Sequence, residues 1–497
     1  MFRNILNWIR ETWNKMFTSN NIKSATGNDV LISQPMAGAL TLWTSMYQNQ
    51  PPWLNKDVRA IGLPASISGE IARMATIEMS VVVSGSPRAD FLNVQLERIV
   101  SKLRQYIEFG NAKGGLVFKP YVSNGMIGVD CVQADMFYPV SFQSNGNMTA
   151  VIFADVRKRG AYYYTRLESH SLVNNVCTIR NIAYKSTTEN TLGNPCSLLE
   201  VADWAGLQPE AIITGITAPL YGYYRYPSAN NIDTTSPLGV SCYSRAQDAN
   251  GGVELIKQAD EIYSSLVWEF ESGKRALYVD ELAFEQGTDN KPKLPDRRLY
   301  RTLKMSGQIG KSDDMFKEWS PAFREASIKS GLDAVLKKIE FACGLAYGVI
   351  SDPQAIALTA TEIKSSQQRT YATVTDVQKS VEEALEQLLY AMDVYATLYS
   401  LAPRGTYTAT YEFDDSVITD KEVQKATDKQ SVDLGAMSLV EYRMRTYNED
   451  EKTAKAKIIM ARTQRADRVM ERVSQVRQGA PNNNVMPNDN QAVENGR

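Results

Sequence analysis

Residues 219–280, PLYGYYRYPSANNIDTTSPLGVSCYSRAQDANGGVELIKQADEIYSSLVWEFESGKRALYVD, decide the fold of this chain. A loop is predicted over Tyr226–Gly239, because that stretch is rich in residues that favour turns. A helical repeat of apolar residues follows and ends at Gly273, and the run Ala276–Val279 then predicts a strand. The turn residues are Pro227, Asn230, Asn231, Asp233, Pro237 and Gly239, and the apolar helix positions are Leu255, Ile256, Ala259, Ile262, Tyr263, Leu266, Val267 and Phe270.

A second helix is predicted over residues 322–349, beyond a polar stretch at 285–321 that contains several prolines and glycines. At 1.5 Å per residue this helix would be about 40 Å long. The helix predicted at 251–274 comes before the polar stretch and this one comes after it. The two are therefore expected to form a pair that carries a small α/β insertion at its tip. The apolar face of the second helix consists of Ile328, Leu332, Val335, Leu336, Ile339, Ala342, Cys343 and Ala346.

The segment 351–359, SDPQAIALT, interrupts the helical pattern, because Pro353 cannot sit inside a helix. The helix restarts at once, since Thr359 and Glu362 are spaced as the two ends of a capping box. This third helix is predicted to continue to about residue 400, a length of about 60 Å.

Further helices are predicted upstream at 36–48, 64–83 and 89–109. Alternating apolar and polar residues then indicate a β-rich region up to about residue 185. The pairs Asn124–Gly125 and Asn145–Gly146 lie between apolar runs and predict tight hairpins. The helix at 89–109 is expected to end at the glycines Gly110, Gly114 and Gly115.

The two ends of the chain differ in character. Residues 1–17 have the pattern of an amphipathic helix, for which docking on the chain's own surface is favoured over binding to a membrane. A short strand at 406–413 precedes helices from about 420 to 476. Residues 479–497 have almost no large apolar side chains and are predicted to be disordered.

Composition narrows the class of protein. The chain has 497 residues, 43% of them hydrophobic, which suggests about three or four domains. A formal net charge of −2 argues against general binding to polyanions, so any contact with DNA should be local or weak. The five cysteines contain no CxxC pair, which argues against a disulfide framework or zinc site and for a reducing compartment. No apolar run is long enough for a membrane span.

Three segments carry a resemblance to a known family. They are 110–153, with GNAKGGLVFKPYV, VDCVQADMFYP and GNMTAVIF; 219–280, with PSANNIDTTSPLGVS before the helix; and 411–458, with an Asp-Ser turn, GAMS and EDEKTA. These segments closely resemble the portal proteins of tailed double-stranded DNA bacteriophages, of the type found in siphophages of Gram-positive hosts. The resemblance extends in order over roughly residues 60–470.

The resemblance implies an α+β portal fold with a wing, stem helices, a clip, a tunnel loop and a helical crown. The expected parts are an N-terminal arm and wing (1–250), first stem helix (251–276), clip (277–321), second stem helix (322–350), tunnel loop (351–359), long wing helix and strand (360–425), crown (426–478) and disordered tail (479–497).

The resemblance also implies a function. A ring of identical subunits, a dodecamer in this family, would form a channel at one capsid vertex for packaging, retention and ejection of double-stranded DNA. Expected partners are terminase, a head–tail adaptor, and the major capsid and scaffolding proteins. The protein would belong to the virion and assemble in the host cytoplasm, with no cofactor, metal or membrane and no enzymatic activity of its own.

Three sets of residues are candidates for function. The tunnel loop, which faces DNA in this family, corresponds to Ser351, Asp352, Pro353, Gln354, Ala355, Ile356, Ala357, Leu358 and Thr359. A basic cluster in the expected clip, either a solvated face or a contact for DNA or docking partners, contains Lys291, Lys293, Arg297, Arg298, Arg301 and Lys304. A row of alternating charge on the second stem helix, Glu325, Lys329, Asp333 and Lys337, should mainly stabilise that helix by about 0.2–0.5 kcal/mol per pair. In a ring the row could also pair neighbouring subunits or face the channel.

Three sequence patterns that could indicate a catalytic or metal site each have a better structural explanation. His170 has no assignable nucleophile and is expected to be a surface or packing residue. The stretch 110–115 lacks the order of a phosphate-binding loop and is predicted to be a turn. Asp414, Asp415 and Asp420 do not fit a calcium loop, and capping by Thr419 or Asp420 explains them better. Two alternatives to the portal function therefore remain: a non-channel capsid or scaffold oligomer, and, less favoured, a nucleic-acid-processing enzyme.

Overall fold

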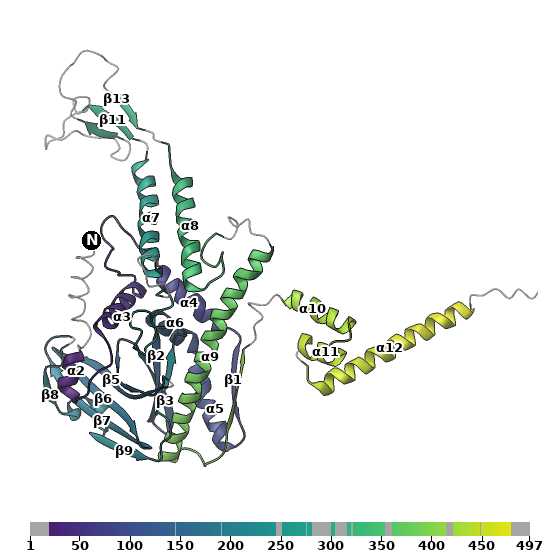
Figure 1. The fold of residues 1–497 in the computed structure, drawn as a ribbon, viewed down its shortest axis with the longest axis horizontal. Helices are drawn as coiled ribbons and strands as arrows, with labels where there is room; N and C mark the ends of the chain where they lie inside the picture. The colour runs from purple at the N-terminus through teal and green to yellow at the C-terminus, as the bar shows by residue number, and fades with distance from the viewer. Residues whose placement is uncertain are drawn as a thin grey trace, which may run out of the picture. The chain divides into compact units, whose positions relative to one another are not determined.

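The computed structural model divides the chain into two compact units, Met1–Asp414 and Asp415–Arg497 (Figure 1). Both contain helices, and the described residues of the first also form four sheets, which agrees with the α+β class. The predicted amphipathic helix at 1–17 and the predicted tail at 479–497 lie outside the described residues. The described residues are 19–144, 146–189, 191–244, 251–274, 276–280, 300–303, 316–319, 322–352, 360–413, 421–447 and 449–478.

The largest sheet of the first unit is antiparallel, with strand order β4-β5-β6-β7-β8 and β9 paired to β7. Its presence confirms the β-rich region predicted up to about residue 185. The β6–β7 turn uses Asn174 and Asn175, both with positive φ, which matches the twist of the flanking strands. The strands are β4 (Phe137–Phe142), β5 (Met148–Arg159), β6 (Tyr162–Val173), β7 (Val176–Ser186), β8 (Asn194–Cys196) and β9 (Glu210–Thr214).

A second sheet has the order β10-β2-β3, with β2 (Gly115–Ser123), β3 (Met126–Gln133) and β10 (Gly222–Arg225). Asn124 and Gly125 have φ values of 51° and 72°, so this predicted hairpin is confirmed. At the other predicted hairpin Gly146 has a φ of 87°, and Asn145 lies outside the described residues. Buried residues from both faces of β2 lie beneath α6 and the long helix α9 (Ala360–Leu398).

The prediction of a single helix over 64–83 was wrong. Helix α4 (Leu63–Thr76) ends earlier, and Met79–Ser84 forms strand β1, which pairs with β14 (Thr408–Phe413). The β-branched run at Val81–Val83 favours a strand. Its pairing partner lies more than 300 residues away along the chain, so the local pattern could not reveal it.

The helix predicted over 89–109 is two helices, α5 (Pro87–Val100) and α6 (Leu103–Lys113), separated at Ser101 and Lys102. Residues 110–113 therefore belong to the last turn of α6, and the prediction that they form a turn was wrong. Gly110 does not end the helix: it lies where an added Cβ would come within 2.6 Å of the Tyr224 ring. The end is Gly114, which has a φ of 85°.

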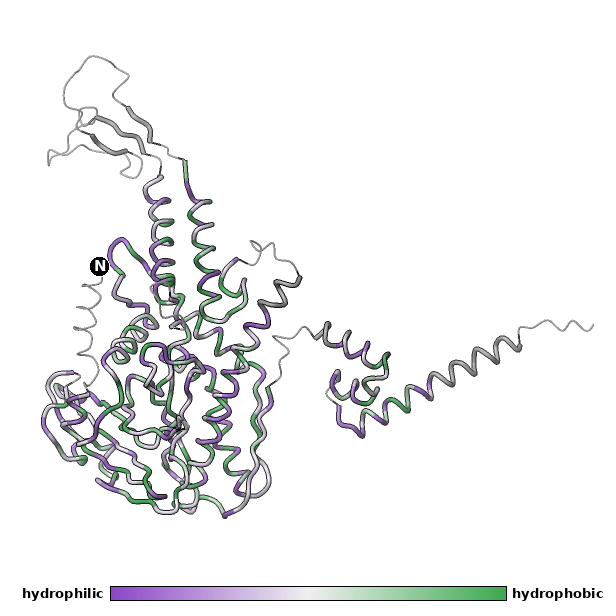
Figure 2. The backbone as a smooth tube through the Cα atoms, in the orientation of Figure 1, coloured by the Kyte–Doolittle hydropathy of each residue, from purple (hydrophilic) through white to green (hydrophobic). Residues whose placement is uncertain are grey.

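Two helices, α7 (Gly252–Ser272) and α8 (Glu325–Cys343), pack side by side and carry a small three-stranded sheet (Figure 1). That sheet has the order β12-β11-β13, with β11 (Ala276–Asp280), β12 (Tyr300–Leu303) and β13 (Phe316–Trp319). Helix α8 is shorter than predicted, because Gly344 adopts a φ of 75° and ends it. Hydrophobic (green) and hydrophilic (purple) residues recur along the whole length of both helices in Figure 2, as expected of amphipathic helices.

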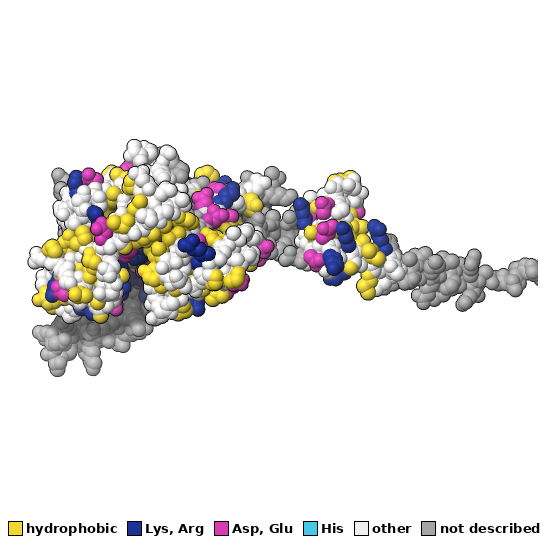
Figure 3. Space-filling model, turned by 90° about the horizontal axis from the view of Figure 1, so that it is seen from below, with side chains coloured by type: hydrophobic (Ala, Val, Ile, Leu, Met, Phe, Trp, Pro, Cys, Tyr) yellow, Lys and Arg dark blue, Asp and Glu magenta, His cyan; other side chains and the backbone are white. Residues whose placement is uncertain are grey.

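Among the described residues the first unit also contains α2 (Ser19–Thr26) and α3 (Gln34–Tyr47). Helix α9 contributes much of the core. Its described side chains include ten buried apolar residues: Val374, Val377, Val381, Ala384, Leu385, Leu388, Leu389, Ala391, Met392 and Ala396. Acidic and basic side chains are interspersed, not separated by sign, on the face of the first unit seen in Figure 3. No described helix is long and apolar enough to cross a membrane.

The second unit consists of α10 (Lys421–Asp433), α11 (Leu439–Tyr447) and α12 (Glu451–Gln478), which confirms the helices predicted from about 420 to 476. Its side chains are mostly exposed where they are described, with Asp428 and Ala454 buried. Asp414, Asp415, Thr419 and Asp420 lie outside the described residues. The division between the units falls before α10, whereas the expected boundary of the crown at 425/426 lies inside that helix.

Candidate functional site

The distal end of the α7–α8 pair is closed by a charged clamp. Glu269 of α7 is buried and accepts three hydrogen bonds from Arg324, from its backbone N (3.0 Å), Nε (3.2 Å) and Nη2 (2.8 Å). These hydrogen bonds lower the pKa of Glu269. The rings of Phe270 and Phe323 pack beside the clamp, with centroids 5.7 Å apart. The clamp fixes the two helices to each other near the point where the small sheet begins.

The proximal end of α8 is organised by Glu340, a fully buried acid with 0% exposure. Its Oε1 accepts hydrogen bonds from the backbone N of Gly348 (3.1 Å), Ile350 (2.6 Å) and Ser351 (2.9 Å). Its Oε2 accepts another from Ser351 Oγ at 2.9 Å. The chain after α8 therefore wraps around one carboxylate, which satisfies donors that burial would otherwise leave unpaired.

Helix α9 holds the same turn from the other side. Thr370 Oγ1 accepts a hydrogen bond from the backbone N of Ala346 (2.6 Å), and Thr373 Oγ1 donates one to the carbonyl of Gly344 (3.0 Å). The Arg369 guanidinium lies 4.5 Å from the centroid of the Phe341 ring on α8. Residues 344–352 are thus fixed between α8 and α9. We call these residues the pinned turn.

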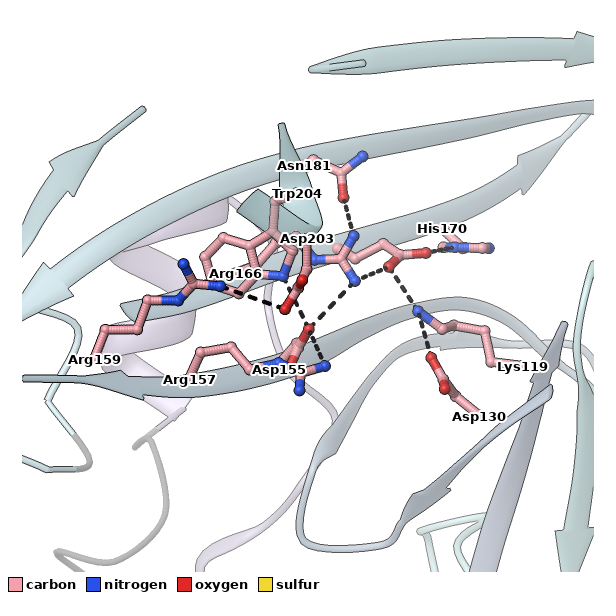
Figure 4. Close-up of polar contacts among 11 residues, drawn as sticks. Lys119, Asp130, Asp155, Arg157, Arg159, Arg166, His170, Asn181, Asp203 and Trp204 are labelled. Atoms are coloured by element: carbon pink, nitrogen blue, oxygen red, sulfur yellow. Dashed lines mark hydrogen bonds and ion pairs between the residues drawn. The ribbon is translucent and has the colours of Figure 1, made fainter. Parts of the chain in front are cut away.

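A buried polar network lies elsewhere, between the two larger sheets (Figure 4). Glu168 on β6 contacts Lys119 (2.7 Å), Arg166 (3.0 Å) and His170 Nε2 (2.8 Å). Burial alone would raise the pKa of Glu168, but these partners, Lys119 foremost, hold it well below its ordinary value. Asp155 extends the network through Arg166 (3.7 Å) and Arg157 (2.9 Å) and accepts a hydrogen bond from the indole Nε1 of Trp204 (3.1 Å).

The network borders a polar cavity of about 500 Å³, and its chemistry is that of paired charges. His170 is buried, packs edge-on against Phe153 and Tyr221, and contacts Glu168, so it is a packing residue and not a surface one. Within the described residues no group of three His, Cys, Asp or Glu side chains is placed to hold a metal ion. The five cysteines are free thiols.

Comparison with models of protein families identifies the family to which the chain belongs. Residues 93–468 match the family model described as "Phage portal protein, SPP1 Gp6-like". The chain belongs to this family of phage portal proteins. Members are structural proteins, which agrees with the prediction that the function is not enzymatic.

Solved structures similar to this portal protein include two described as "Neck of native GTA particle computed with C12 symmetry" and "Neck of empty GTA particle computed with C6 symmetry". The first is 10% identical, covers 78% of this chain and 90% of its own, and has a TM-score of 0.36. The second is 11% identical, covers 86% and 97%, and has a TM-score of 0.35. No curated protein matches the chain.

The structure describes part of the predicted portal site. In the predicted tunnel loop, Ser351 is buried against Glu340, and Asp352 is exposed and donates its backbone N–H to Asp333 Oδ1 at 3.3 Å. Residues 353–359 lie outside the described part of the chain. In the predicted charge row Asp333 also pairs with Lys337 at 2.7 Å. In the predicted basic cluster the structure describes the backbone of Arg301, which pairs with Tyr278 of β11. The other members lie outside the described residues: Lys291, Lys293, Arg297, Arg298 and Lys304.

Sequence reasoning missed the two buried acids, Glu269 and Glu340, that organise the ends of the α7–α8 pair. Glu340 has a local signal, because it falls between Leu336 and Cys343 on the apolar side of α8, where an acid needs a partner. Glu269 has no such signal, since its partner Arg324 lies 55 positions later. The polar network of β6 also went unseen, because its members come from strands that are brought together only by the fold.

Proposed function

We propose that this portal protein assembles into a ring-shaped channel at one vertex of a phage capsid, through which double-stranded DNA is packaged, retained and ejected. The observation that carries the proposal is the α7–α8 pair, which projects a small sheet at one end and enters the pinned turn at the other. Family membership over residues 93–468 supports the same function.

Each part of the fold has a place in this proposal. Helices α7 and α8 are the stem, and the β12-β11-β13 sheet belongs to the clip. The two larger sheets, with α9, form the wing, and α10–α12 form the crown. The last two residues of the pinned turn are the first two of the proposed tunnel loop, 351–359, so Glu340 would set the position from which this loop starts.

A channel that moves DNA should grip it weakly. Affinity for DNA rises steeply with the number of cations placed on phosphates, and a ring multiplies each such cation by the number of subunits. The ion pair between Asp333 and Lys337 reduces the free positive charge along α8. The net charge of −2 for the whole chain also suits sliding.

The proposed partners follow from this role. Terminase would dock on the clip from outside the capsid and supply the energy for packaging, and a head–tail adaptor would later occupy the same end. The major capsid and scaffolding proteins would surround the ring during assembly in the host cytoplasm. A twelve-subunit ring, and a siphophage of a Gram-positive host, are the forms that the resemblance favours.

Removal of the gene from its phage tests the proposal. We expect particles without this protein to lack packaged DNA, and antibody-labelled protein to lie at a single vertex of complete capsids. Protein spread evenly over the capsid surface, or DNA-filled heads in its absence, would contradict the proposal.

A further inference from the structure

An exposed tryptophan marks the outer side of α7. Trp268 is 60% exposed and lies opposite the buried residues Leu255, Ile256 and Ala259 around the helix. It lines a groove of about 430 Å³ between α7 and residues 56–59. Large aromatic residues that remain exposed at the edge of a groove commonly mark interaction surfaces.

The groove is a built feature and not a gap between loose segments. Arg59 donates its backbone N–H to Ser264 Oγ at 2.8 Å, and Ile61 donates its own to Asp260 at 2.9 Å. The indole Nε1 of Trp53 donates to the other oxygen of Asp260, also at 2.9 Å. Residues 53–61 are therefore fixed along α7, on the side away from α8 (Figure 1).

Helix α8 has an exposed face of a complementary kind. Phe341 is 60% exposed there, and the residues on the same side toward the distal end are small: Ser327, Ser330, Gly331 and Ala334. A Cβ added at Gly331 would meet no atom within 4 Å. This face can therefore admit a bulky side chain from another molecule. The Arg369 guanidinium covers part of the Phe341 ring, whose side chain is still 60% exposed.

The charges of the two faces are also complementary. The groove is lined by Lys56, Asp57, Arg59, Glu261 and Glu271, three acids and two bases, which gives a net charge of −1. Arg59 and Glu271 lie 3.6 Å apart. The face of α8 carries Lys338, with Arg369 beside Phe341, while Lys337 is paired with Asp333.

We propose that the exposed face of α8 in one copy of this chain docks into the α7 groove of the next copy, with Trp268 against the small residues around Gly331. The inference rests on the proposed ring. The two faces lie on opposite sides of the helix pair, so each copy would offer one face to each neighbour. Such head-to-tail contacts form closed rings when the rotation between copies permits.

The test compares the oligomeric mass of purified full-length variants. Gly331→Leu places a bulky side chain in the proposed contact, yet it should fold normally, because the site is open and leucine favours helix. Trp268→Ala removes the proposed anchor. We expect each to weaken association on the order of tenfold or more per contact. Gly331→Ala and Leu199→Ala, at a site 73% exposed in the same unit, are the matched controls and should assemble like the wild type.

A charge exchange adds a readout that damage to the fold cannot imitate. Lys338→Glu and Glu261→Lys should each impair assembly, and the double variant should recover much of it because complementarity is restored. If the wild type forms rings and Gly331→Leu and Trp268→Ala form them equally well, the docking inference is wrong while the proposed function stands. If the wild type itself stays monomeric, both fail.

Discussion

Replacement of Glu340 is the sharpest perturbation that the structure offers. In Glu340→Ala, the backbone N–H groups of Gly348, Ile350 and Ser351 and the Ser351 hydroxyl lose this acceptor. The Gly348 N–H keeps Ser351 Oγ as a second acceptor at 3.1 Å. The other three donors are left unsatisfied at about 1–3 kcal/mol each, which gives a ceiling of about 9 kcal/mol. The donors lie within residues 348–351, and the N–H groups of Gly348 and Ile350 are only half-buried, so they can turn to water together. We therefore expect a loss nearer about 3–5 kcal/mol.

Glu340→Gln is the more informative variant. It keeps an oxygen for the three backbone donors and removes the charge, which roughly halves the strength of such hydrogen bonds. We expect the pinned turn to open more easily by about 1–2 kcal/mol, which corresponds to about 5- to 30-fold faster hydrogen exchange. Hydrogen exchange of residues 348–351 in the full-length protein measures this opening.

The control is Glu383→Gln, at an exposed acid of α9 in the same unit. It should leave exchange in the pinned turn unchanged. If Glu340→Gln exchanges there at the wild-type rate, the carboxylate does not hold the turn and the argument from its four hydrogen bonds is refuted. If exchange rises while DNA packaging stays normal, Glu340 is structural only.

Three further predictions concern other parts of the chain. The partners of Glu168 lower its pKa, so its contribution to stability is present at neutral pH and is lost as pH falls below its ordinary value of 4.5 toward the lowered pKa; Glu168→Gln should cost about 3 kcal/mol at pH 7 and flatten this acid limb in denaturant unfolding. Gly110→Ala should destabilise the first unit by about 1–3 kcal/mol, measured by thermal unfolding, because its Cβ would overlap the Tyr224 ring. Replacing Ile356 and Leu358 together by glutamate should block packaging while oligomers still form, as counted from DNA-filled heads.

Each of these has an outcome that opposes it. Equal stability of Glu168→Gln and wild type between pH 7 and pH 4 would show that the network contributes little. A Gly110→Ala protein with unchanged thermal stability would mean that the Tyr224 ring moves aside freely. Full packaging by the double glutamate variant would leave residues 351–359 as a plain connector.

The sequence predicted those elements whose signal is local. The helix at Leu255–Phe270 and its end at Gly273 follow from spacing and turn chemistry, and α7 has these bounds to within a few residues. Asn124–Gly125 predicts its hairpin because φ is positive at both positions. The resemblance to phage portal proteins rested on short segments of this kind, and the family match over 93–468 agrees with it.

The features that could not be predicted from the sequence depend on contacts between residues that are far apart in the chain. Met79–Ser84 extends an apolar helical pattern and becomes a strand only because β14 pairs with it. The role of Glu340 depends on a backbone turn that brings three N–H groups to one oxygen, and no residue type in 348–351 specifies it. Lys119 and Glu168 meet across two different sheets, so neither position suggests the other.

Electron microscopy of the purified full-length protein tests the central claim most directly. The account predicts closed rings of a single subunit number with an open centre. It also predicts that protruding stems from the α7–α8 pairs surround one end of that opening. Monomers at micromolar concentration, open chains of variable length, or compact assemblies without a central channel would contradict it.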